Sequence, residues 1–162
     1  MEDSVLKIVY TFFVGVMLAL FIGLGIDAVY SQPEYPDSTI YSGSSEPTVA
    51  EQQAMQDEQD AYQSSIETYN RTVSIIATAF AVAMLVLSLA LEKKNKVLTN
   101  GVMLGGLFTL IYGVGRGFTS GDSKTTFITV AVGLVVVLFL GYRRFAHRGH
   151  AAGPPSTAGL GG

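Results

Sequence analysis

The stretch TVSIIATAFAVAMLVLSLAL, residues 72–91, is followed by EKKNK, residues 92–96, and then by VLTNGVMLGGLFTLIYGVG, residues 97–115. Crossing about 30 Å of hydrocarbon takes about 20 mostly apolar residues, so each long run predicts a transmembrane helix. The three lysines of the connection predict that it lies in the cytoplasm, because Lys and Arg are enriched in cytoplasmic loops. These 44 residues therefore predict a membrane hairpin that begins and ends outside.

Two further apolar runs flank this hairpin and predict an all-α membrane protein with four transmembrane helices. IVYTFFVGVMLALFIGLGIDAVY, residues 8–30, precedes the hairpin, and TFITVAVGLVVVLFLGY, residues 126–142, follows it. The composition agrees, because 49% of the 162 residues are hydrophobic and only 14% are charged, against about a quarter charged in soluble domains. The first run is too long for the apolar part of a secretory signal peptide and has no small-residue cleavage site, so we expect it to be retained.

The distribution of charge predicts the orientation of the four spans. Seven of the ten Lys and Arg residues would lie on the side of the EKKNK connection, whereas the 31–70 segment has eight acids and no base. The positive-inside rule then predicts that both termini are cytoplasmic. Three arginines after the last span are expected to contact anionic lipid headgroups: Arg143, Arg144 and Arg148.

The outer segment between the first two spans is predicted to be irregular and then helical. Residues 31–46 are rich in Pro, Ser and Gly, whereas good helix formers without a breaker follow residue 48. We expect Ser45 to be the N-cap and Pro47 to lie in the first turn.

The predicted segments are a cytoplasmic N-terminus (1–7), a first span (8–30), the irregular segment (31–46), an outer helix continuous with the second span (47–91, crossing at 72–91), a cytoplasmic loop (92–96), a third span (97–115), an outer loop (116–125), a fourth span (126–142) and a basic, then disordered cytoplasmic tail (143–162).

The predicted outer helix carries one apolar stripe. Met55, Tyr62, Ile66 and Tyr69 recur at spacings of seven, four and three, which places them on one helix face. Two interpretations remain open. The stripe packs on the chain's own 35–41 segment, or it is a docking surface for a partner helix or a second copy.

Two opposite charges are predicted to lie at the same depth near the outer membrane boundary. Lys7 to Asp27 is twenty residues, about 30 Å of helix, and Asn100 to Arg116 is sixteen residues, about 24 Å. An ion pair between Asp27 and Arg116 is therefore possible, and the alternative is that each charge reaches interfacial water separately.

Small residues predict close packing between the first and third spans. Gly101 and Gly105 form a GxxxG motif, which lets two helix backbones approach. Gly15, Gly23 and Gly25 are the expected counterparts on the first span. Three polar residues at mid-span are expected to bond carbonyls of their own helices: Thr78, Ser88 and Thr109.

The segment FFVGVMLALFIGLGIDAVYSQPEYP, residues 12–36, resembles the opening of small uncharacterised bacterial multi-pass membrane proteins. The resemblance implies a location in the bacterial cytoplasmic (plasma) membrane and no known activity. No catalytic constellation is found, and the chain has no cysteine, so we expect no enzyme, cofactor or metal site.

The function expected from the sequence is that of an accessory or scaffold subunit of a larger membrane complex. Its partners would be the lipid bilayer and a protein, or a second copy, bound through the outer helix; no nucleic acid is expected. The alternative is a small transporter or channel component with Asp27 and Arg116 near its outer mouth.

Overall fold

A computed structural model describes residues 2–36, 48–93 and 95–146 of the chain. These residues form helices α1 (Glu2–Val29), α2 (Val49–Leu91), α3 (Lys96–Phe118) and α4 (Ser123–Ala146). Each of these helices contains a stretch long and apolar enough to cross a membrane. The prediction of an all-helical protein with four such helices is confirmed, and the chain is a multi-pass membrane protein by the length and composition of its helices.

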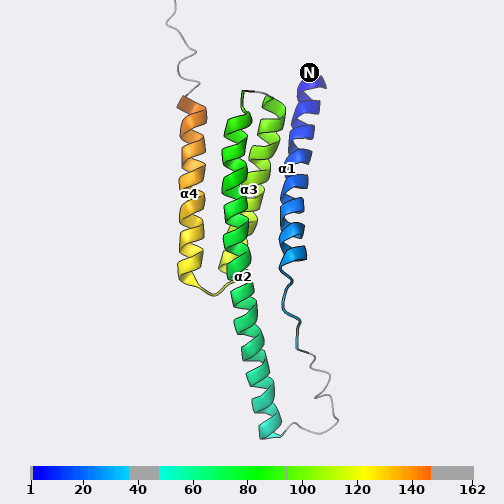
Figure 1. The fold of residues 1–162 in the computed structure, drawn as a ribbon, viewed down its shortest axis with the longest axis vertical. Coiled ribbons are helices and arrows are strands. Elements are labelled where there is room, and N and C mark those ends of the chain that lie inside the picture. Colours follow the sequence, from blue (N-terminus) through cyan, green and yellow to red (C-terminus); the bar gives the residue numbers. More distant parts are fainter. Residues whose placement is uncertain (1, 37–47, 94, 147–162) are drawn as a thin grey trace, which may run out of the picture.

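The bundle is built around the antiparallel pair of α2 and α3, which share the most extensive contact. Helix α1 packs mainly against α3, and α4 packs against α3 and α2 on the other side (Figure 1). The first half of α2 continues past the ends of the other three helices. We call residues 49–68 the arm, because the buried residues of α2 begin at Tyr69, and we call the adjoining end of the bundle the arm end.

Helix α2 begins with a capping box rather than at the predicted N-cap. The side chain of Thr48 accepts the N–H of Glu51, and the Glu51 carboxylate accepts the N–H of Thr48 over 2.7 Å. This Thr-x-x-Glu pattern satisfies two N–H groups that a helix start leaves without partners. The helix therefore begins at Val49, and the predicted N-cap Ser45 lies outside the described residues.

The other three helices extend beyond the predicted spans. Helix α1 begins at Glu2, α3 continues to Phe118, and α4 runs from Ser123 to Ala146, so residues 119–122 connect the last two helices. The early start of α4 has a local cause, because the Asp122 carboxylate accepts the N–H of Lys124 over 3.0 Å. Gly121 completes the tight connection with a φ of 67°, a conformation that glycine adopts without strain.

Small residues of α3 bring it close to α2. A Cβ added at Gly106 would meet Leu85 at 2.9 Å, and one added at Gly113 would meet Thr78 at 2.9 Å. The closeness lets the Ser74 hydroxyl donate to the Gly113 carbonyl over 2.8 Å. Bonds of this type stabilise helix pairs where water is absent.

The three polar residues predicted to bond their own helices behave differently from one another. Thr109 bonds the carbonyl of Gly105 in its own helix, as expected. Ser88 instead bonds the Thr99 carbonyl on α3, because α3 lies close enough to compete with the local carbonyl. The hydroxyl of Thr78 has no hydrogen-bond partner among the described residues.

Helix α1 meets α3 at the predicted GxxxG residues. A Cβ at Gly101 would lie 2.8 Å from Val14, and one at Gly105 would lie 3.0 Å from Leu18. Of the three expected counterparts, Gly15 takes part, because a Cβ there would meet Leu104 at 3.0 Å. At Gly23 and Gly25 a Cβ would meet nothing within 4 Å. These two glycines therefore lie on open faces of α1, although Ile26 between Gly25 and Asp27 is buried against α2.

Candidate functional site at the arm end

Polar side chains from α1, α2 and α3 converge at the arm end of the bundle. Arg116, in the last turn of α3, donates from Nη1 to Oδ1 of Asn70 over 2.8 Å and from Nε to the Tyr112 hydroxyl over 3.2 Å. Asn70 is only 5% exposed, and its Nδ2 donates to the Thr119 carbonyl over 3.2 Å. Both ends of this amide are therefore bonded, and Asn70 holds the guanidinium in place.

Two aromatic rings also flank the guanidinium. Its central carbon lies 5.3 Å from the ring centre of Tyr69 and 5.6 Å from that of Tyr112. Cations within about 6 Å of a ring centre are attracted by the negative face of the ring. The rings stabilise the charge of Arg116 without using all of its N–H donors.

Asp27 is linked to this cluster by a tyrosine rather than by a direct ion pair. Its Oδ1 accepts the hydroxyl hydrogen of Tyr69 over 2.9 Å, while the hydrogen bonds of Arg116 go to Asn70 and Tyr112. The structure thus brings both predicted charges to one site and places Tyr69 between them. Asp27 is exposed, whereas Tyr69 is almost fully buried.

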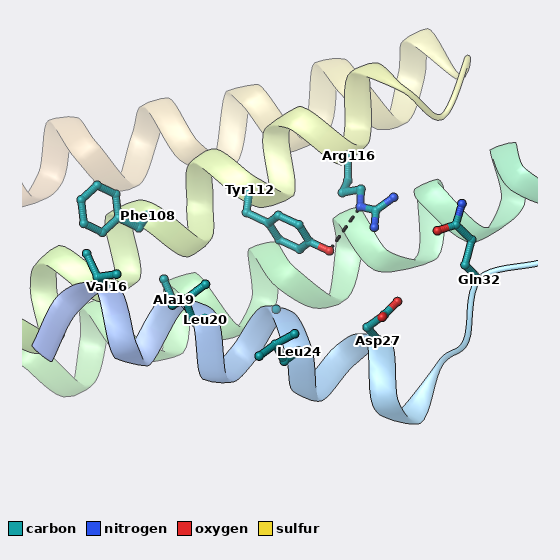
Figure 2. A pocket seen from close by; sticks show the side chains of 10 residues that line it. Val16, Ala19, Leu20, Leu24, Asp27, Gln32, Phe108, Tyr112 and Arg116 are labelled. Carbon is teal, nitrogen blue, oxygen red and sulfur yellow. Dashed lines mark hydrogen bonds between the residues drawn. The ribbon is translucent and has the colours of Figure 1, made fainter. Parts of the chain in front are cut away.

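A cavity of about 540 Å³ runs along α1 and α3 to these charges (Figure 2). Asp27 and Gln32 lie on one side of its polar end, and Arg116 and Tyr112 lie on the other. Towards the opposite end the lining is apolar. Its ten lining residues are Val16, Ala19, Leu20, Gly23, Leu24, Asp27, Gln32, Phe108, Tyr112 and Arg116.

Much of the predicted apolar stripe is in contact with the chain that follows α1. The Tyr35 ring lies edge-on to Tyr62, with centres 5.1 Å apart, and Tyr30 is stacked on Tyr69 at 5.4 Å. Ile66 packs against the buried cluster that contains Tyr69. Met55, nearer the free end of the arm, is half-buried. This geometry favours the interpretation in which the stripe packs on its own chain; residues 37–41 of the expected cover lie outside the described residues.

A second charged contact lies beside the cluster. Nε of Arg71 is 3.7 Å from Oδ2 of Asp122. The hydroxyl of Thr125 and the N–H of Lys124 donate to the Asp122 carboxylate. These two bonds, with a smaller contribution from Arg71, hold the pKa of Asp122 below its usual value.

Of the predicted headgroup contacts, Arg143 and the backbone of Arg144 lie at the opposite end of the bundle. Arg143 is exposed in the last turns of α4. Arg144 is also in α4, but its side chain and the whole of Arg148 lie outside the described residues. The structure brings none of the described basic residues of this end into the cluster around Arg116.

Sequence reasoning missed Asn70 and Tyr112 as parts of the site. Their signals were present. Asn70 is a polar residue next to the second span, and Tyr112 precedes Arg116 by four residues, one helical turn. Gln32 was missed as well, because nothing in a Pro- and Ser-rich segment indicates that this residue lines a cavity with residues of α3.

Comparison with known proteins gives no relative for this site. No protein-family model, no curated protein and no solved structure matches the chain. Within residues 2–36, 48–93 and 95–146, no group of three or more His, Cys, Asp or Glu side chains could hold a metal ion.

Proposed function

We propose that this protein is a non-enzymatic accessory or scaffold subunit of a larger membrane complex, and that the arm is its contact surface. The observation that carries the proposal is the projection of the arm, which amounts to about 30 Å of helix past the rest of the bundle (Figure 1). The contacts of the arm at Tyr62 and Ile66 lie towards the bundle, and a helix with few packing partners is only marginally stable in water. A projecting helix of this length is well suited to be held by another protein.

The chemistry of the free arm surface indicates the kind of partner. Asp57, Glu58 and Asp60 are exposed, and residues 31–70 contain no Lys, Arg or His. Tyr62 and Tyr69 already contact the chain's own tyrosines. The contact would therefore use the acidic faces more than the apolar stripe, and the partner would present a basic surface.

The same proposal includes a location. The arm would lie on the outer side of the bacterial plasma membrane, with both termini in the cytoplasm. The excess of Lys and Arg at the opposite end of the bundle supports this orientation. The resemblance of residues 12–36 to small bacterial membrane proteins supports the choice of membrane.

The test is co-purification from native membranes in a mild detergent. We expect the wild-type chain to migrate in a complex larger than the monomer and to retain a defined set of proteins. The triple variant Asp57→Lys, Glu58→Lys, Asp60→Lys should release them, because it reverses the charge of the contact face.

The matched control reverses acids at the other end of the bundle, where Asp3 and Glu92 are exposed. The variant Asp3→Lys, Glu92→Lys should keep the complex. A wild-type chain that runs as a free monomer, or a complex that both variants leave intact, would contradict the proposal.

A second candidate function, a small transporter or channel component, is supported by the cavity that carries Asp27 and Arg116 at one end. Its test is Asp27→Asn, which removes the charge and keeps an acceptor for Tyr69. A changed solute flux in proteoliposomes, with the same amount of folded protein, would support this candidate. Absence of any flux in the wild type would contradict it.

A further inference from the structure

The cavity between α1 and α3 has the size and polarity of a site for one amphiphile. Its volume of about 540 Å³ lies within the range of small-molecule sites, about 300–1,000 Å³. Along α1 it extends from Val16 to Asp27, eleven residues or about 16 Å of helix. Apolar side chains line most of this length, and the polar groups lie at one end (Figure 2).

The polar end offers two opposite charges. Arg116 uses Nε and Nη1 for Tyr112 and Asn70, and its Nη2 takes part in none of the hydrogen bonds found among the described residues. A guanidinium held in this way is suited to a phosphate. Asp27 uses Oδ1 for Tyr69, and the second oxygen of an exposed carboxylate is suited to an ammonium group.

The apolar part is open to lipid from the side. Leu20 is 53% exposed and Leu24 is 67% exposed, although both line the cavity. Gly23 lies between them, and a Cβ added there would meet nothing within 4 Å. A hydrocarbon chain could therefore enter from the bilayer, without passing through the bundle.

We propose that this cavity binds one zwitterionic phospholipid of the phosphoethanolamine type, with its phosphate on Arg116, its amine at Asp27 and an acyl chain along Leu20 and Leu24. The site is separate from the acidic faces of the arm. Lipid binding in the cavity therefore does not depend on whether the arm binds a partner. The apolar end at Val16 and Phe108 also favours a bound lipid over a path for ions.

The experiment is native mass spectrometry of the purified chain, equilibrated with equal amounts of phosphatidylethanolamine and phosphatidylglycerol that carry the same acyl chains. We expect the wild type to retain one phosphatidylethanolamine in preference to phosphatidylglycerol. Gly23→Leu fills the cavity and should lower the bound fraction at least about tenfold, the equivalent of about 1.4 kcal/mol.

The matched control is Gly141→Leu on α4, where an added Cβ also meets nothing within 4 Å. This residue does not line the cavity, so lipid binding should remain. Asp27→Asn keeps an acceptor for Tyr69 and should abolish the preference for the amine-bearing lipid while binding continues. If Gly23→Leu does not fold, the lipid preference of Asp27→Asn still tests the proposal.

Equal retention of the two lipids by the wild type would overturn the proposal. Retention by Gly23→Leu at the level of Gly141→Leu would overturn it too, as would an unchanged lipid preference in Asp27→Asn. Preference for phosphatidylglycerol would indicate an anionic lipid on Arg116 alone, and would contradict the role proposed for Asp27.

Discussion

Tyr69 donates its hydroxyl hydrogen to Asp27 over 2.9 Å, and this bond joins α2 to α1 at the arm end. The same ring is stacked on Tyr30 and lies 5.3 Å from the guanidinium of Arg116. One buried tyrosine therefore contacts groups from α1, the segment after α1, and α3. Opposite charges on α1 and α3 are brought together by an aromatic side chain of a third helix.

Tyr69→Phe should lower the free energy of unfolding by about 1 kcal/mol. The ring contacts remain, and only the hydrogen bond is lost. Bonds to charged groups contribute about 1.5–3 kcal/mol, but Asp27 is exposed, so water replaces the hydroxyl and reduces the loss. Reversible unfolding in mixed micelles measures the change.

The control is Tyr10→Phe, because Tyr10 is 53% exposed and lies near the opposite end of α1. It should unfold like the wild type. Equal losses in the two variants would show that the hydrogen bond to Asp27 has no specific effect.

The sequence could predict that Asp27 and Arg116 lie at a common level of the bundle, but it could not predict their contacts. A bilayer fixes the length of each span, so counting residues from Lys7 and Asn100 places Asp27 and Arg116 at a similar level. Which side chains join them depends on the rotation of each helix about its axis, and that is set by packing. The bonds of Arg116 to Asn70 and Tyr112 are of this kind.

The glycines of α3 are a second case in which the sequence predicts one contact but not another. The spacing of Gly101 and Gly105 indicates one close helix contact, and both residues lie against α1. The second close face of α3, at Gly106 and Gly113, has the seven-residue spacing of a heptad, but that spacing does not say which helix lies against it. It became recognisable only with α2 beside it.

Gly105→Ala should destabilise the bundle by about 1–3 kcal/mol, the usual cost of an overpacked contact. An added Cβ would lie 2.9 Å from Met84, 3.0 Å from Leu18 and 3.1 Å from the Gly15 carbonyl. Thermal unfolding in detergent measures the loss.

Gly115→Ala is the matched change on the same helix, because a Cβ there meets nothing within 4 Å. It should leave stability unchanged or raise it by up to about 1 kcal/mol through helix propensity. If Gly105→Ala were as stable as Gly115→Ala, α1 and α3 would not be in close contact at this point.

Acid should weaken the connection between α3 and α4. Bonds from Thr125 and Lys124 lower the pKa of Asp122 in the folded state. A lowered folded pKa contributes stability above the ordinary value of about 4, and this contribution is lost as the pH falls through the folded value. The Tm of the wild type should therefore drop more between pH 6 and pH 3 than that of Asp122→Asn.

Removing an acid that is exposed on the arm provides the comparison. Asp60→Asn changes the net charge by the same amount at an exposed position, and it should keep the acid sensitivity of the wild type. If Asp122→Asn retained the full sensitivity, the acid response would have to come from other carboxylates.

The orientation of the bundle can be tested directly, because the chain has no cysteine. Gln63 on the arm and Lys93 after α2 are both exposed, so each can be replaced by cysteine without disturbing the core. Lys93 lies at the end of the bundle that is rich in Lys and Arg, and the positive-inside rule predicts that this end is cytoplasmic. A membrane-impermeant thiol reagent applied to intact cells should therefore label Gln63→Cys, and should reach Lys93→Cys only after permeabilisation. The reverse pattern would place the acidic arm in the cytosol, and labelling of both variants in intact cells would mean that α2 does not cross the membrane.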